Sequence, residues 1–278
     1  MAHCNVLECL LNLDMKKSVP IGISVISLLL SSCGNTEEPN SSGLVPEQVS
    51  DSADIPEQLD KSVVSMPVYP RLDNEKCEEF LLKYGAEHPE NRVIIHTDLG
   101  DMEVELFDDT PIHRANFLYL IHRNYFNPTE ILRVIKGFVI QGGNSDEEEP
   151  QTKRFLIGDY TLPSEIRPNR IHLRGALAMS RSYEKNPEKR SSSYDFYLVH
   201  GSIPGSVQIH ESKQKRKYSE EQIADYLKIG GAMHLDEEHT VFGRLVKGFD
   251  VLDRIANVEV DKTDWPKNTI MLRMEIKE

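Results

Sequence analysis

Cysteine is scarce in this chain and confined to its N-terminal part. Of the 278 residues only four are cysteines, and none follows Cys77, so no disulfide can join segments of the C-terminal two thirds. No two cysteines have the CxxC spacing of structural zinc sites or thioredoxin-like redox centres.

Positively charged residues are fewer than negatively charged ones. The chain has 32 Lys and Arg and 45 Asp and Glu, which gives a net charge of -13. A nucleic-acid partner is therefore not expected, since phosphate binding needs a basic surface.

The first 33 residues have the pattern of a secretory signal. Two lysines follow Met15, an apolar run extends from Val19 to Leu30, and small residues precede Cys33. The run, about 12 residues, is too short for a helix that spans a bilayer, which needs about 20. The order resembles a bacterial lipoprotein signal with a lipobox, with a plain cleaved signal or a truncated membrane helix as the alternatives. We expect translation to start at Met15, so that residues 1–14 have no role.

Lipidation at Cys33 would place the protein in the cell envelope, anchored to a bacterial membrane and either periplasmic or surface-exposed. Residues 34–70 are rich in Pro, Ser, Glu and Asp and nearly lack aromatic side chains. Such a segment buries too little apolar surface to offset its ordering entropy, so we expect a disordered acidic tether. In residues 71–91 we expect a helical extension, because apolar side chains recur at helical spacing from Leu72 to Tyr84, where Gly85 would end the helix.

The remaining residues, 92–278, have the pattern of one mainly β domain. Two helices are predicted, one from Thr110 and Pro111 to about His122 and one over 249–256. A capping box at Ser219 predicts a short inserted helix to Leu227. Short strands are predicted at 92–97, 102–107, 131–135, 138–141, 175–180, 195–200, 240–246 and 270–276.

Eight strands suit a closed barrel whose interior is just filled by side chains. We therefore expect a closed eight-stranded antiparallel barrel with two capping helices, the extra N-terminal helix and the inserted short helix. Because such an interior has no room for a ligand, any binding site is expected on the outside of the barrel.

Two blocks of sequence, ILRVIKGFVIQGG at 131–143 and HLDEEHTVFG at 234–243, resemble the cyclophilins, a family of peptidyl-prolyl cis-trans isomerases. GALAMS at 175–180 and DFYLV at 195–199 lie between them, and the likeness extends over about residues 92–278. The matching residues are Arg133, Gly137-Phe138 and Gln141-Gly142-Gly143 in the first block, and Leu235-Asp236, His239 and Phe242-Gly243 in the second. The resemblance implies the cyclophilin barrel and prolyl isomerase activity.

Prolyl isomerisation requires no nucleophile, metal or cofactor, and none is expected here. The barrier to rotation about a peptide bond is about 18–20 kcal/mol, and a charged donor beside the nitrogen favours the twisted amide over the planar one. Arg133 is the candidate catalytic group, and by the resemblance Gln141 would hydrogen-bond the substrate backbone and help to hold Arg133. The proline slot implied by the family match is lined by Phe138, Val139, Tyr197, Leu235 and His239.

Four positions around this groove depart from the family pattern. Ser180 and Arg181 replace the usual Ala-Asn pair that contacts the peptide, and Asp195 replaces a Gln. A carboxylate at Asp195 could pair with Arg133 and either quench or orient it, which the residues leave open. His234 stands where the family usually has a Trp that helps to bind the inhibitor cyclosporin, so weak sensitivity to cyclosporin is expected.

Other motifs favour structural explanations. His234 and His239 are five residues apart, the wrong spacing for metal ligands on one helix face. Gly142-Gly143 lacks the lysine of a phosphate loop and predicts a tight turn. The basic run at 213–217 and the acidic run at 147–149 are interpreted as solvated.

Two functions follow from these patterns. The first is an active prolyl isomerase, a monomer that acts on proline-containing unfolded or exported polypeptides and is held to a membrane through Cys33. The alternative is a catalytically weak cyclophilin-like module that binds proline peptides or acts as a holdase.

Overall fold

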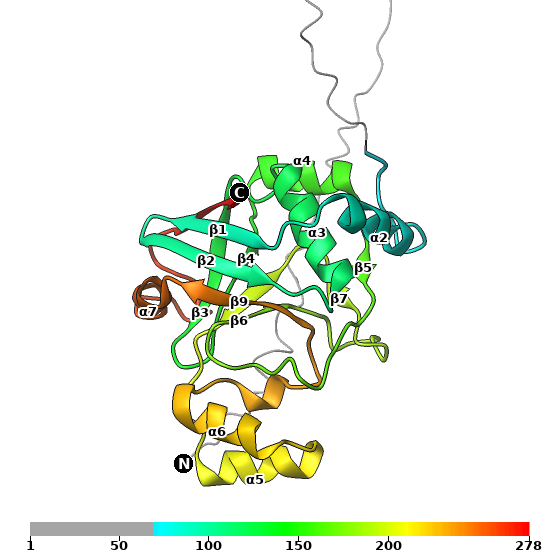
Figure 1. The fold of residues 1–278 in the computed structure, drawn as a ribbon. Helices are drawn as coiled ribbons and strands as arrows, with labels where there is room; N and C mark the ends of the chain where they lie inside the picture. Colours follow the sequence, from blue (N-terminus) through cyan, green and yellow to red (C-terminus); the bar gives the residue numbers. More distant parts are fainter. Residues whose placement is uncertain (1–68, 278) are drawn as a thin grey trace, which may run out of the picture. The chain divides into compact units, whose positions relative to one another are not determined.

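Eight antiparallel strands close into a barrel in the order β1-β10-β3-β4-β8-β6-β9-β2 (Figure 1). The computed structural model describes residues 69–277, so the predicted signal, Cys33 and nearly all of the predicted tether lie outside the described residues. The barrel strands are β1 (Arg92–Thr97), β2 (Gly100–Leu106), β3 (Thr129–Ile135), β4 (Val139–Asn144), β6 (Ala176–Met179), β8 (Phe196–Val199), β9 (Val241–Lys247) and β10 (Met271–Ile276). The predicted closed eight-stranded barrel is confirmed.

Alternating side chains fill the barrel interior. Along β2, Met102, Val104 and Leu106 are buried, while the residues between them face outward, as expected for a strand with one face on the core. From α3 (Pro111–His122), the ring of Phe117 packs against three other phenylalanine rings at centroid distances of 5.2 to 5.6 Å. The helices α3 and α7 (Phe249–Ala256) lie at opposite ends of the barrel (Figure 1). Because the interior is packed, binding is left to the outer face.

The N-terminal helix differs from its predicted bounds. Helix α2 runs over Cys77–Glu87, so it begins later than Leu72 and passes through Gly85. A Cβ at Gly85 would lie 2.9 Å from the Cβ of Ala115 on α3. Gly85 therefore permits a close approach of two helices, and the prediction that it ends the helix was wrong.

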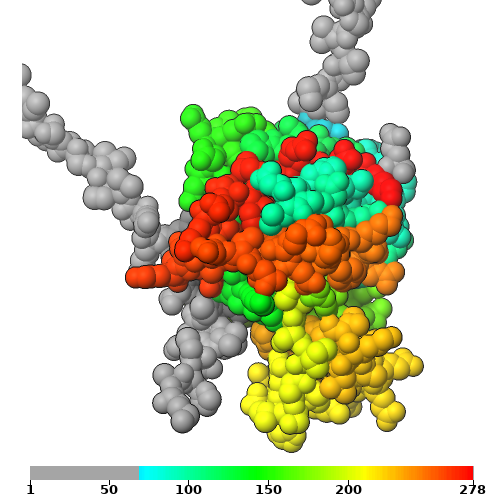
Figure 2. Space-filling view, turned by 90° about the vertical axis from the view of Figure 1, so that its left-hand side faces the viewer, coloured from blue at the N-terminus to red at the C-terminus, as the bar shows by residue number. Residues whose placement is uncertain are grey.

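The insertion holds two helices where one was predicted. Helix α6 (Glu220–Ile229) begins at the predicted capping box of Ser219 and Gln222, but α5 (Ser206–Lys215) precedes it. Together they form a lobe that projects from the barrel (Figure 2). The basic run at 213–217 is exposed at four of its five residues, as expected, but its first part ends α5 instead of forming a loop, and Arg216 is buried.

A further helix, α4 (Glu148–Ile157), and a small sheet of β5 (Thr161–Leu162) and β7 (Ser191–Ser192) were also not predicted. Helix α4 buries only Pro150 and Ile157, so its sequence carries no apolar period to reveal it. Its acidic first turn is exposed, as expected, and suits the positive end of the helix dipole.

Gly142 and Gly143 lie inside β4, so the prediction of a tight turn was wrong. Gly143 has φ +99°, and a Cβ there would lie 2.3 Å from the carbonyl oxygen of Tyr194. Only glycine suits that approach. Within residues 69–277, no helix is long and apolar enough to cross a membrane.

Candidate active site

Three of the predicted site residues form a row across neighbouring strands. Arg133 on β3 is paired with Gln141 on β4, and Gln141 is paired with Tyr197 on β8. Directly opposed residues of antiparallel strands project from the same face. The next residues along, Ile140 and Leu198, belong to the barrel core, so the row must lie on the outer face.

Arg133 is buried although it lies on the outer face, with 5% of its surface exposed. Its Nε lies 3.5 Å from Oδ2 of Asp264, and the Asp264 carbonyl accepts the amide of Val134 at 2.9 Å. Among the described residues, Nη1 of Arg133 is buried without a hydrogen-bond partner. A desolvated guanidinium with a free N–H is suited to donate to a ligand that enters this face.

The acidic partner of Arg133 is therefore Asp264, not Asp195. The Asp195 carboxylate instead accepts a hydrogen bond from the hydroxyl of Ser192 at 2.6 Å. Gln141 lies beside Arg133 in register, but among the described residues it does not satisfy Nη1 of the guanidinium, which has no hydrogen-bond partner. The supporting role expected for Gln141 stays a prediction.

Apolar side chains flank the row of Arg133, Gln141 and Tyr197. Val139 and Leu235 are buried, with 4% and 2% of their surfaces exposed, yet neither belongs to the barrel core cluster. Phe138 precedes β4, and its ring lies 4.9 Å from the ring of His234 in the short helix η1 (Met233–Leu235). These contacts place the predicted slot residues beside β4 and η1.

His239 is held in one tautomer by two hydrogen bonds. Its Nδ1 donates to the carbonyl of Met179 at 3.1 Å, so its Nε2 accepts from the hydroxyl of Tyr183 at 2.7 Å. Burial, and next the nearby His172, lower the pKa of His239 to about 3. The ring is therefore neutral near pH 7 and suits an apolar slot.

The stability of the protein should fall in acid because of His239. An unfolded histidine titrates near pH 6.5, so the unfolded chain binds a proton that the folded protein excludes. Between pH 7 and pH 5 we expect this group to lower the free energy of unfolding by about 2 kcal/mol. When urea unfolding is measured at both pH values, the free energy of unfolding should fall by about 2 kcal/mol less in His239→Gln than in the wild type. Equal losses in the two proteins would show that His239 is protonated in the folded state.

Tyr197 ends a buried chain of hydrogen bonds. Nδ1 of His172 donates to Oδ1 of Asp236 at 2.9 Å, which leaves Nε2 of His172 to accept from the hydroxyl of Tyr197 at 3.0 Å. The side chains of His172 and Asp236 are fully buried. Burial alone would raise the pKa of Asp236, but the hydrogen bonds from His172 and Tyr226 outweigh it and lower the pKa. The aspartate is therefore ionised, and it fixes the orientation of the His172 ring behind the slot.

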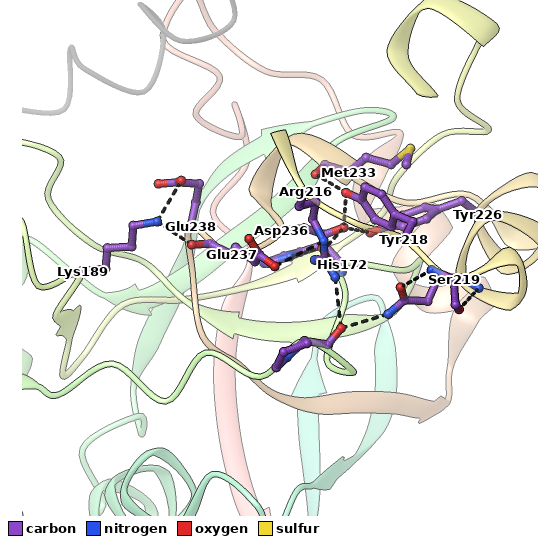
Figure 3. A network of polar contacts seen from close by, with 12 residues as sticks. His172, Lys189, Arg216, Tyr218, Ser219, Tyr226, Met233, Asp236, Glu237 and Glu238 are labelled. Carbon is purple, nitrogen blue, oxygen red and sulfur yellow. Dashed lines mark hydrogen bonds and ion pairs between the residues drawn. The ribbon is translucent and has the colours of Figure 1, made fainter. Parts of the chain in front are cut away.

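The same carboxylate joins the projecting lobe to the barrel (Figure 3). Oδ2 of Asp236 accepts the hydroxyls of Tyr226 at 2.7 Å and Tyr218 at 2.8 Å, and Nη1 of Arg216 lies 3.6 Å away. All three residues belong to the insertion, and Tyr226 is fully buried. The insertion and, through His172, the predicted slot residue Tyr197 are therefore joined to one buried anion.

Two more of the predicted substrate-binding residues, Arg181 and Ser180, form hydrogen bonds within the protein. Arg181 donates through Nε to the carbonyl of Glu238 and through Nη2 to its carboxylate, each at 2.6 Å. Lys189 also donates to that carboxylate, at 3.0 Å. The amide of Ser180 donates to the carbonyl of Asp195 at 2.9 Å, which places both residues at the adjoining ends of β6 and β8.

Sequence reasoning missed several residues that support the site, namely Asp264, His172, Tyr183, Tyr218, Tyr226 and Glu238. Most lie outside the two recognised blocks, where no motif signals them. Asp236 and Glu238 lie in the second block, but the block does not show what they bind.

Comparisons with known proteins give a consistent result. The family model described as "Cyclophilin type peptidyl-prolyl cis-trans isomerase/CLD" matches residues 92–276. The peptidyl-prolyl cis-trans isomerase-like 3 of Dictyostelium discoideum is 33% identical over 186 residues, 65% of this chain and 91% of that protein. A Staphylococcus saprophyticus protein assigned the same isomerase activity is 30% identical over 210 residues, 74% of this chain and 96% of that protein.

Among solved structures, the chain resembles a cyclophilin-type isomerase of Cryptosporidium parvum, crystallised in the presence of the dipeptide Ala-Pro. The two share 26% identity, with a TM-score of 0.49, over 67% of this chain and 99% of that one.

Proposed function

Since the chain belongs to the cyclophilin-type peptidyl-prolyl cis-trans isomerases, we propose that it rotates Xaa-Pro bonds of exported polypeptides and that Arg133 is its catalytic residue. The observation that carries this proposal is the buried, unpartnered Nη1 of Arg133 among the described residues, on the outer face of the barrel. Donation to the prolyl nitrogen would stabilise the twisted amide, in which that nitrogen is basic, and not the planar one.

One such donor, together with orientation of the peptide, is sufficient for the rate enhancement of an isomerase. Xaa-Pro bonds exchange at about 10⁻² s⁻¹ without a catalyst, and a rate of about 10³ s⁻¹ corresponds to a barrier lower by about 7 kcal/mol. Loss of one preorganised donor typically costs about 3–4 kcal/mol, and orientation of the peptide can supply the rest. Asp264 supports the donor role, because a contact at 3.5 Å to Nε orients the guanidinium without occupying Nη1.

An isomerisation assay with a proline peptide tests the proposal. The chain is expected to accelerate cis-trans exchange of the peptide, and the absence of acceleration would contradict isomerase activity in this chain. The weak binding module is the second candidate, because the contact that orients Arg133 would also weaken its donor role if the Asp264 carboxylate neutralised the guanidinium. Binding of proline peptides without turnover, together with turnover restored by Asp264→Asn, would establish that Asp264 quenches the arginine.

Sensitivity to cyclosporin provides a separate prediction at His234. Its ring packs against Phe138 at a tilt of 33° but is smaller than the Trp usual in the family, so we expect weak inhibition. His234→Trp should strengthen inhibition by about 5- to 30-fold, because added aromatic area is worth about 1–2 kcal/mol. Inhibition curves for the two proteins measure this difference. Nanomolar inhibition of the wild type would contradict the expectation.

We also propose that the protein is held to a membrane of the cell envelope. The basic, apolar and small-residue order before Cys33 supports lipidation and export, and the acidic composition of residues 34–68 supports a spacer between the anchor and the isomerase. Proline-containing polypeptides that emerge in the cell envelope would then be the substrates. Metabolic labelling with a fatty acid tests the anchor, and incorporation should be lost in Cys33→Ser.

A further inference from the structure

A cluster of three potential metal ligands lies far from the slot, between the N-terminal extension and α3. Among the described residues, His88, Glu90 and His122 form the one group of this kind, with one ligand atom of each within 4.8 Å of the others. His88 follows the end of α2, Glu90 lies in the connection to β1, and His122 is the last residue of α3. Helices α2 and α3 lie side by side at the end of the barrel away from the projecting lobe (Figure 1).

We propose that His88, Glu90 and His122 bind one Zn²⁺ ion that fastens the N-terminal extension to α3. Two imidazoles and one carboxylate are a donor set that zinc accepts, with water as a fourth ligand. Imidazole nitrogen also selects transition metals over Ca²⁺ and Mg²⁺, which prefer oxygen. Nothing in the isomerase reaction uses these three residues.

Contacts around the cluster restrain the backbone of two ligands and the rings of both histidines before any ion binds. The buried guanidinium of Arg114 donates to the carbonyls of His88 and Glu90, each at 3.2 Å, and to the carbonyl of Gly85. Nδ1 of His122 lies 2.5 Å from the hydroxyl of Tyr84, and the Tyr84 ring stacks on His88 at 4.2 Å. Such supporting contacts orient metal ligands and raise affinity.

The Arg114 guanidinium brings one positive charge near the cluster, and a carboxylate oxygen and two helix ends oppose it. Oε2 of Glu90 is buried and, among the described residues, lacks a hydrogen-bond partner, so it has an unmet need for a donor or a cation. Both α2 and α3 end at the cluster, and helix C-termini carry partial negative charge. Donor atoms on one tetrahedral zinc lie about 3.3 Å apart, whereas Nδ1 of His88 and Oε1 of Glu90 are 3.8 Å apart. Zinc binding therefore requires a small movement of these side chains, and the exposure of His122 leaves room for its ring to adjust.

Titration of the metal-free full chain with Zn²⁺, followed by calorimetry, tests the proposal. The wild type is expected to bind one more equivalent of Zn²⁺ than His88→Ala or His122→Ala. The cysteine thiols elsewhere in the chain are the same in all three proteins, so any zinc that they bind does not affect this difference. Glu90→Gln should raise the Kd for this zinc ion by at least about tenfold. His210→Ala, which removes an exposed histidine on α5, is the matched control and should bind like the wild type.

Thermal unfolding gives an independent measurement. Zn²⁺ should raise the Tm of the wild type and of His210→Ala, since a ligand that binds only the folded state stabilises it, and it should leave the Tm of His122→Ala unchanged. Equal stoichiometry and equal Tm shifts in all variants would show that zinc binds elsewhere and would overturn the proposal. Absence of zinc binding by the wild type would overturn it as well.

Discussion

Arg133→Ala is expected to lower kcat/KM for a proline peptide by about 10²- to 10³-fold, the loss typical for one preorganised donor to a transition state. The loss should fall mainly on kcat, because the guanidinium favours the twisted amide over the planar one. The measurement is an isomerisation assay over a range of peptide concentrations. An unchanged kcat would show that Arg133 is not the catalytic residue.

Two further variants control this experiment. Arg133→Lys keeps a positive charge but lacks the planar set of donors, so we expect it to recover little of the activity. Arg273→Ala removes an exposed arginine on β10 and should leave kcat/KM unchanged. The Arg133 side chain lies outside the barrel core cluster, so its loss should leave the barrel folded, which cooperative thermal unfolding would verify.

The barrel could be predicted from the sequence because its strands alternate cleanly. Met102, Val104 and Leu106 show the period of two that a half-buried strand requires, and capping residues such as Ser219 mark a helix start directly. Helix α4 escaped prediction because it buries only two residues and carries no such period. Gly85 was misjudged because a glycine that ends a helix and one that admits a neighbouring helix look alike in sequence.

Candidate site residues could be named from the sequence where a recognised motif carries them, and not where distant segments meet. Arg133, Gln141 and Tyr197 follow from motifs, and strand register brings them together. The partner of Arg133 is Asp264, from a loop 131 positions along the chain (264 − 133), and no local pattern announces it. Asp195 was the expected neighbour of the arginine, but Ser192 lies close enough to bind its carboxylate.

The buried carboxylate of Asp236 should have the largest effect on stability. Asp236→Ala removes the acceptor of the His172 amide and ring and of the hydroxyls of Tyr218 and Tyr226. It also removes one of the two carboxylates near the buried Arg216, and leaves only that of Glu237, 3.6 Å from Nε. Breaking a buried pair from one side costs about 3–5 kcal/mol, so we expect the free energy of unfolding in urea to fall by that amount.

Two further variants show whether the loss of stability comes from the buried carboxylate itself. Tyr226→Phe removes one donor to the ionised carboxylate and should cost about 1.5–3 kcal/mol, whereas Asp225→Ala changes an exposed carboxylate on α6 and should cost less than about 0.5 kcal/mol. Because His172 also holds the Tyr197 hydroxyl, Asp236→Ala should raise KM for a proline peptide as well. A variant as stable as the wild type would show that water satisfies these donors and that the insertion does not depend on the carboxylate.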